Sequence, residues 1–138
     1  MTTKKTISLR QLAGAAVLAT GAGMWANSAS AQAVTYTDAQ AAAGANAYGA
    51  ACSRCHGLQA QGAEAPPLTG AQFAGSWRDG PVSSLLDFIS TLMPEDKPGS
   101  LSKDAYVSIV AYLLKLNGIP AGTDALPNPP PEGMKIPK

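Results

Sequence analysis

The run CSRCH at residues 52–56 constrains the fold of this chain more than any other feature of its sequence. It contains both cysteines and the single histidine of the 138 residues. The pattern C-x-x-C-H is the attachment signature of a c-type haem. Two thiols at this spacing add to the two vinyl groups of one porphyrin, and the histidine that follows then lies under the iron as its proximal ligand. The motif therefore predicts one covalent haem c, held by Cys52 and Cys55 and ligated by His56.

Three other uses of a cysteine pair fit the sequence less well. A structural zinc site needs four ligands, and here only carboxylates would remain to complete the set. A thioredoxin-type redox pair follows a strand, and the sequence has no alternating strand pattern. A disulfide between cysteines three residues apart in a helical segment has poor geometry. Haem attachment is therefore the favoured interpretation.

The sixth ligand to the iron cannot be a second histidine of this chain, because His56 is the only one. Two methionines, Met93 and Met134, follow the motif. Met93 stands at the end of a predicted helix and directly before Pro94, whereas Met134 lies in a proline-rich segment. Because a metal ligand should be held by packed structure, position favours Met93. A thioether ligand of this kind raises the reduction potential.

The helix pattern predicts an all-α domain of three or more short helices joined by long loops. The first helix is expected from Ala39 to about Arg54, because alanine has the best helix propensity and Thr37 or Asp38 supplies an N-cap. A second helix is expected from Val82 or Ser83 to Leu92, where apolar residues fall at helical spacing. Pro94 ends it.

The last helix has the clearest signals. Ser102 is a good N-cap, apolar residues follow at helical spacing, and Asn117-Gly118 ends the helix. Residues 57–82 are dense in glycine and proline and are predicted to be loop. Six of the 11 prolines lie between residues 119 and 138, so this segment is expected to run extended over the surface or to be partly disordered.

Residues 1–33 have the layout of a secretory signal peptide. The first ten residues carry three basic side chains and no acidic one, and residues 11–24 form an apolar run rich in Ala and Gly. That run is shorter than the roughly 20 residues that span a bilayer, which argues against a permanent anchor. Small residues then offer a cleavage site after Ala31 or Ala33. The prediction is a periplasmic protein with a cleaved leader.

Removal of the leader leaves a domain at residues 34–122 and a proline-rich tail at residues 123–138. This mature part keeps seven of the ten Lys and Arg residues and all nine acids, so its formal charge is about −2. Nothing in it forms a basic stripe, which argues against nucleic acid as a partner.

Together these residues resemble the class I cytochrome c family, and the resemblance covers most of the mature chain. The matching positions are Gly44, Tyr48, the motif at residues 52–57, Pro66-Pro67-Leu68, Met93-Pro94 and the stretch from Ile109 to Leu113. The resemblance implies a cytochrome c-like fold in which helices pack around one covalent haem. It also implies that Gly44 is small so that the last helix, with Ile109 and Tyr112, can approach the first.

The resemblance further implies roles for five residues around the haem. The Pro66 carbonyl would accept a hydrogen bond from His56 Nδ1, and Leu68 would pack on the haem. Phe73 and Trp77 would form a haem wall, and Trp77 Nε1–H or Arg78 would meet a haem propionate. Ordinary aromatic core is the other interpretation of Phe73 and Trp77.

The stretches at residues 93–102 and 117–122 are similar to cytochrome modules that accept electrons from periplasmic quinoprotein dehydrogenases. The resemblance therefore implies a dehydrogenase as electron donor and an oxidase or another cytochrome as acceptor. The chain would act alone or as a subunit of a dehydrogenase complex, without stable membrane insertion of the mature form.

The function expected from the sequence is one-electron transfer, not enzymatic catalysis. With His56 and Met93 filling both axial positions, the iron would cycle between Fe(II) and Fe(III) without binding a substrate. The alternative is a haem enzyme or gas sensor in which Met93 does not bind the iron and one coordination position stays open. The chain has no second histidine to serve such an enzyme as acid or base. A subunit whose haem relays electrons within a fixed complex is a third interpretation.

Overall fold

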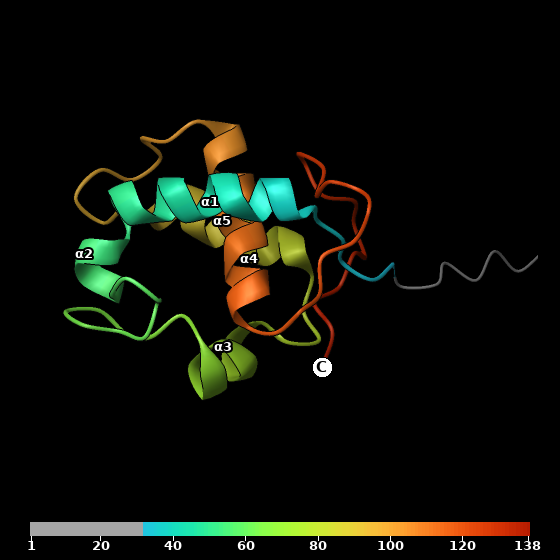
Figure 1. Cartoon of the computed structure of the whole chain (residues 1–138), viewed down its shortest axis with the longest axis horizontal. Helices are drawn as coiled ribbons and strands as arrows, with labels where there is room; N and C mark the ends of the chain where they lie inside the picture. The colour runs from blue at the N-terminus through green and yellow to red at the C-terminus, as the bar shows by residue number, and fades with distance from the viewer. Residues whose placement is uncertain (1–31) are drawn as a thin grey trace, which may run out of the picture.

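The structure is a computed structural model that describes residues 32–138, and this range folds into five helices joined by loops, with no strand (Figure 1). The helices are α1 (Asp38–Ala51), α2 (Ser53–His56), α3 (Gly70–Trp77), α4 (Val82–Leu92) and α5 (Lys103–Leu116). The prediction of an all-α fold is thus confirmed for this part of the chain. The expected leader lies almost entirely outside the described residues.

Helices α1 and α5 form the main helix pair, and they cross at Gly44 (Figure 1). A Cβ atom added to Gly44 would overlap the backbone carbonyl of Ser108, and it would lie 3.0 Å from the amide nitrogen of Ile109. One turn further along, the rings of Tyr48 and Tyr112 meet with their centroids 5.3 Å apart. The expected close approach at Gly44 is therefore present, and it involves the backbone of α5 directly.

The predicted helix starts are confirmed where a side-chain cap was expected. The Thr37 hydroxyl accepts from the amide of Gln40 at the start of α1, and the Ser102 hydroxyl accepts from the amide of Ala105 at the start of α5. Each bond satisfies a donor that the first helical turn leaves free. Helix α5 ends at Leu116, and Asn117 is its C-cap, as the predicted stop at Asn117-Gly118 requires; Gly118 follows with a φ of +75°.

The first helix does not run unbroken to Arg54 as predicted, because it bends at Cys52 before α2 begins. Cys52 has a φ of −120°. Next to it, the Ser53 hydroxyl donates to the carbonyl of Gly49 at 2.7 Å. A serine that bonds back to the carbonyl four residues earlier competes with the regular backbone bond and bends the helix.

The prediction that residues 57–82 are all loop is wrong for α3. This helix is capped from outside its own sequence, since the side-chain oxygen of Asn117 accepts from the amide of Gly70 at 3.1 Å. Phe73 is buried and fastens the helix to the core. Both contacts are tertiary, so the local content of glycine and proline does not reveal them.

The segment after α5 returns along the N-terminal segment, where the red and cyan traces lie side by side in Figure 1. The amide of Val34 donates to the carbonyl of Lys135 at 3.0 Å, and the amide of Lys135 donates to the carbonyl of Gln32 at 2.9 Å. The Gln40 side chain both donates to and accepts from the backbone of Leu126. The C-terminal segment is thus packed into the domain.

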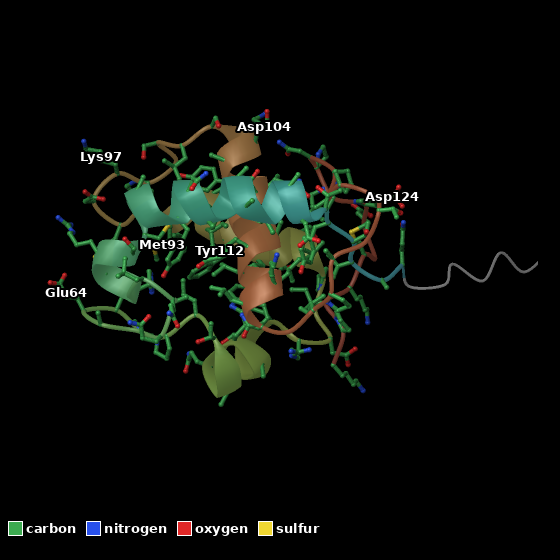
Figure 2. All side chains as sticks on the ribbon, in the orientation of Figure 1. Glu64, Met93, Lys97, Asp104, Tyr112 and Asp124 are labelled. Atoms are coloured by element: carbon green, nitrogen blue, oxygen red, sulfur yellow. The ribbon has the colours of Figure 1, made fainter. Side chains whose placement is uncertain are left out.

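The core consists of apolar and tyrosine side chains from α1, α3, α4, α5 and the two terminal segments, together with Ala60 of the loop after α2. In Figure 2 the partly buried Met93 and Tyr112 lie toward the middle of the view, while Glu64, Lys97 and Asp104 lie at its edge. Within residues 32–138, no helix combines the length and the hydropathy needed to span a bilayer.

Candidate functional site

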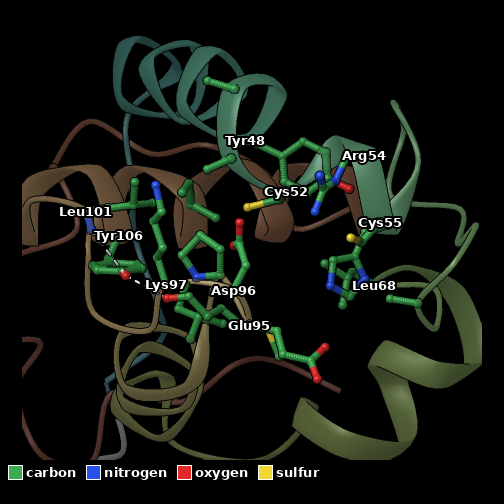
Figure 3. Close-up of a pocket in the computed structure, with 18 of the residues that line it drawn as sticks. Tyr48, Cys52, Arg54, Cys55, Leu68, Glu95, Asp96, Lys97, Leu101 and Tyr106 are labelled. Carbon is green, nitrogen blue, oxygen red and sulfur yellow. Dashed lines mark hydrogen bonds between the residues drawn. The ribbon is translucent and has the colours of Figure 1, made fainter.

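A cavity of about 710 Å³ opens between the C-terminal end of α1, helix α2 and the loop that follows α4 (Figure 3). A smaller cavity of about 210 Å³ shares several of its lining residues and extends toward α3. Six predicted site residues line the larger cavity: Cys52, Cys55, His56, Pro66, Leu68 and Met93. The structure therefore brings together residues that are up to 41 positions apart in the sequence.

The two cysteines are free thiols at this cavity and form no disulfide. Burial, and next the neighbouring Cys55, raises the pKa of the Cys52 thiol to about 11. A redox-active cysteine pair lowers the pKa of its attacking thiol instead. The environment of Cys52 therefore argues against a thioredoxin-type function.

The His56 imidazole is oriented by the backbone behind it. Its Nδ1 lies 2.8 Å from the carbonyl oxygen of Pro66, which is the contact that the resemblance implied. Because a carbonyl accepts only, Nδ1 is the donor of this bond, and Nε2 is the nitrogen that can bind a metal. This arrangement is typical of a metal-ligating histidine, whose second nitrogen donates to a carbonyl or carboxylate.

Backbone bonds hold the Pro66 segment against the motif. The amide of Ala65 donates to the carbonyl of Cys55 at 2.9 Å, and the amide of Leu68 donates to the carbonyl of Ala60 at 2.8 Å. The Leu68 carbonyl in turn accepts from the side-chain amide of Asn117 at 3.0 Å. The loop is therefore fixed at both sides of Pro66.

Met93 and Met134 occupy different environments. Met93 caps the C-terminal end of α4, where its amide donates to the carbonyl of Ile89 at 3.0 Å, and it lines both cavities together with His56. Met134 is 1% exposed in the core, and its carbonyl accepts from the amide of Val82 at 2.9 Å. Met134 is not part of the lining of either cavity. Of the two methionines, only Met93 reaches the site.

Trp77 and Arg78 are adjacent in sequence but differ in position. The Trp77 ring lines the smaller cavity and packs edge-on against Phe88, with centroids 5.4 Å apart. The Arg78 guanidinium instead donates to the carbonyls of Asn117, Pro137 and Lys138. It lines neither cavity. That Arg78 meets a haem propionate stays a prediction; in the structure its donors bind the C-terminal segment and Asn117.

Sequence reasoning missed two residues that organise the site, Tyr106 and Asn117. Tyr106 falls at helical spacing with the apolar residues of the last helix, and Asn117 is part of the predicted helix stop. Tyr106 lines the larger cavity and donates to the carbonyl of Met93 at 2.6 Å. Helical periodicity identifies an inward-facing residue but does not distinguish a packed core from a cavity wall.

The residues of this site fit a covalently held haem. Two free thiols and a histidine with an oriented imidazole lie at one end of the cavity, and a methionine from a distant segment lines the same space. Most of the exposed lining surface is apolar, and the volume falls in the range of roughly 300–1,000 Å³ that is usual for cavities holding a small ligand.

The family model described as cytochrome C oxidase, cbb3-type, subunit III matches residues 39–113, which is more than half of the chain. The matched range begins in α1, includes the motif and Met93, and ends in α5. Comparisons with curated proteins and with solved structures gave no match.

Proposed function

Since the chain belongs to the cytochrome c oxidase cbb3-type subunit III family and is a class I c-type cytochrome, we propose that it is a monohaem electron carrier with His56 and Met93 as axial ligands. The observation that carries this proposal is that both residues line the same two cavities, beside the free thiols of Cys52 and Cys55. No second histidine exists in the chain to compete with Met93.

Each of these residues has a definite role in the proposal. The two thiols anchor the haem by thioether bonds. The Pro66 carbonyl holds the proton of His56 on Nδ1, and the partial negative charge of that oxygen makes Nε2 a stronger ligand. The haem supplies a one-electron Fe(II)/Fe(III) couple. With His56 and Met93 both holding the iron, no position would remain for a substrate, and the chain would act as a carrier and not as an enzyme.

The walls of the cavity set the conditions for electron transfer. Tyr48, Ile89 and Leu113 are buried residues of the lining, and they bring an apolar environment to the site. A low local dielectric favours the less charged Fe(II) form and acts in the same direction as the thioether ligand. We therefore expect a reduction potential at the upper end for c-type cytochromes.

The cellular setting follows from the first 33 residues, which have the layout of a cleaved export signal, so the proposed location is the periplasm. The proposed donor is a periplasmic dehydrogenase, on the resemblance of residues 93–102 and 117–122 to quinoprotein-associated modules. The proposed acceptor is an oxidase or another cytochrome. The name of the family refers to an oxidase subunit, which is consistent with such an acceptor.

Acid–acetone extraction of the purified holoprotein tests covalent attachment. The haem absorbance is expected to remain with the unmutated chain, because thioether bonds survive this treatment. In the double variant Cys52→Ala, Cys55→Ala, any bound haem is expected to move into the acetone phase. Release of haem from the unmutated chain would contradict thioether attachment.

A further inference from the structure

The loop after α4 forms the outer wall of the larger cavity. It begins at Met93 and ends at Leu101, just before α5. Its members in the cavity lining are Met93, Pro94, Glu95, Asp96, Lys97, Ser100 and Leu101. Within it, the amide of Lys97 donates to the carbonyl of Pro94 at 2.9 Å, and the amide of Ser100 donates to the carbonyl of Lys97 at 3.2 Å. The loop thus has two short turns of its own, but these turns do not tie its ends to the domain.

The two ends of the loop meet at the hydroxyl of Tyr106, a residue of α5 that is 4% exposed (Figure 3). This hydroxyl donates to the carbonyl of Met93 at 2.6 Å and accepts from the amide of Leu101 at 3.4 Å. The Met93 carbonyl also accepts a hydrogen bond from the amide of Gly99, which at 3.4 Å is longer. The shortest bond to the backbone of Met93 on its loop side therefore comes from Tyr106.

We propose that Tyr106 is a positioning residue for the axial methionine: its hydroxyl clamps both ends of the 93–101 loop and so keeps the Met93 thioether on the iron. This proposal rests on the proposed function, because it presumes that Met93 is the ligand. Tyr106 itself acts only through the backbone of Met93 and Leu101. Its placement one turn after the Ser102 N-cap makes the clamp a rigid extension of α5.

The clamp has a measurable consequence. An external ligand such as imidazole binds the ferric iron only after Met93 has left it, so its apparent affinity reports how readily the loop opens. A buried hydrogen bond contributes about 0.5–1.5 kcal/mol net, so its loss should raise the apparent imidazole affinity by roughly 2- to 13-fold.

The test compares Tyr106→Phe with Tyr36→Phe in the ferric holoprotein. Tyr36 is a matched control, because it is fully buried, its hydroxyl donates to the carbonyl of Ile119, and it lines neither cavity. Spectrophotometric titration with imidazole is expected to show the increase only in Tyr106→Phe. Tyr36→Phe is expected to lose thermal stability while its imidazole affinity stays within about twofold of the unmutated protein.

Equal imidazole affinities in Tyr106→Phe and the unmutated protein would overturn the clamp. A spectrum without methionine–iron(III) ligation in the unmutated protein would instead overturn the ligand assignment in the proposed function. If Tyr106→Phe does not accumulate, amide hydrogen exchange of the unmutated protein decides. The Leu101 amide is expected to exchange at least tenfold more slowly than those of Glu95 and Asp96, and equal rates would refute the clamp.

Discussion

The crossing of α1 and α5 at Gly44 makes the replacement Gly44→Ala a sharp test of the packing. The added methyl group meets the backbone of Ser108 and Ile109, and no flexible side-chain end is available to move away. The helices must therefore separate or shift. Because the CSRCH motif follows directly on α1, a shift of this helix also disturbs the anchor of the site.

The magnitude follows from two opposing terms. Overpacking in a well-packed core costs about 1–3 kcal/mol, and contact with the backbone places this case at the upper end of that range. Replacing a glycine within a helix by alanine returns about 1 kcal/mol in propensity. The net loss in free energy of unfolding is about 2 kcal/mol, which lowers the unfolding temperature by roughly 10 °C in a domain of this size.

Gly49→Ala is the matched control, because this glycine lies in the same helix and an added Cβ would meet nothing within 4 Å. This replacement gains the better helix propensity of alanine without overpacking the core. We therefore expect the free energy of unfolding to increase by up to about 1 kcal/mol. Thermal unfolding of both holoproteins, followed by circular dichroism, gives the comparison. If Gly44→Ala unfolds at the same temperature as Gly49→Ala or above it, the close crossing of the two helices is refuted.

Three further predictions concern the contacts around the site. Asn117→Ala removes the hydrogen bonds to the Gly70 amide and the Leu68 carbonyl. We expect the free energy of unfolding, measured with urea, to fall by about 2 kcal/mol and the Gly70 amide to exchange its hydrogen faster. Unchanged exchange of this amide would contradict the capping role. Arg78→Ala should leave the haem spectrum unchanged but expose the C-terminal segment to carboxypeptidase. A shifted reduction potential with an intact C-terminal segment would instead support the propionate role. Burial raises the pKa of Tyr48 to about 12 from its usual 10. Tyr48 therefore loses its proton in the unfolded state at a lower pH than in the folded state, so the free energy of unfolding should fall as the pH rises from 10 to 12. In Tyr48→Phe that part of the pH dependence should disappear, and an unchanged profile would refute its assignment to Tyr48.

The parts of the fold that were predicted correctly depend on local signals. The Thr37 and Ser102 caps, the stop at Asn117 and the proline after Met93 each act within a few residues, so the sequence is enough to place them. The site motif is equally local, since thioether attachment dictates both the cysteine spacing and the following histidine. Met93 was found by elimination and position, and the structure places it at the cavity.

The parts that were missed depend on contacts between distant segments. Helix α3 begins at a cap supplied by Asn117, and the Arg78 guanidinium binds the backbone oxygens of Pro137 and Lys138. Met134 lies in the segment that was expected to run extended over the surface or to be partly disordered, but this segment folds back and buries it. None of these contacts leaves a periodic or compositional trace near the residue concerned, so single-sequence reasoning does not detect them.

The visible spectrum of the ferric holoprotein tests the central claim most directly. The unmutated protein is expected to show the weak far-red band of methionine–iron(III) ligation. Met93→Ala should abolish this band, and Met134→Leu, the control for the buried methionine, should retain it. Survival of the band in Met93→Ala, or a high-spin ferric spectrum in the unmutated protein, would contradict the assignment of His56 and Met93 as the axial pair of an electron carrier.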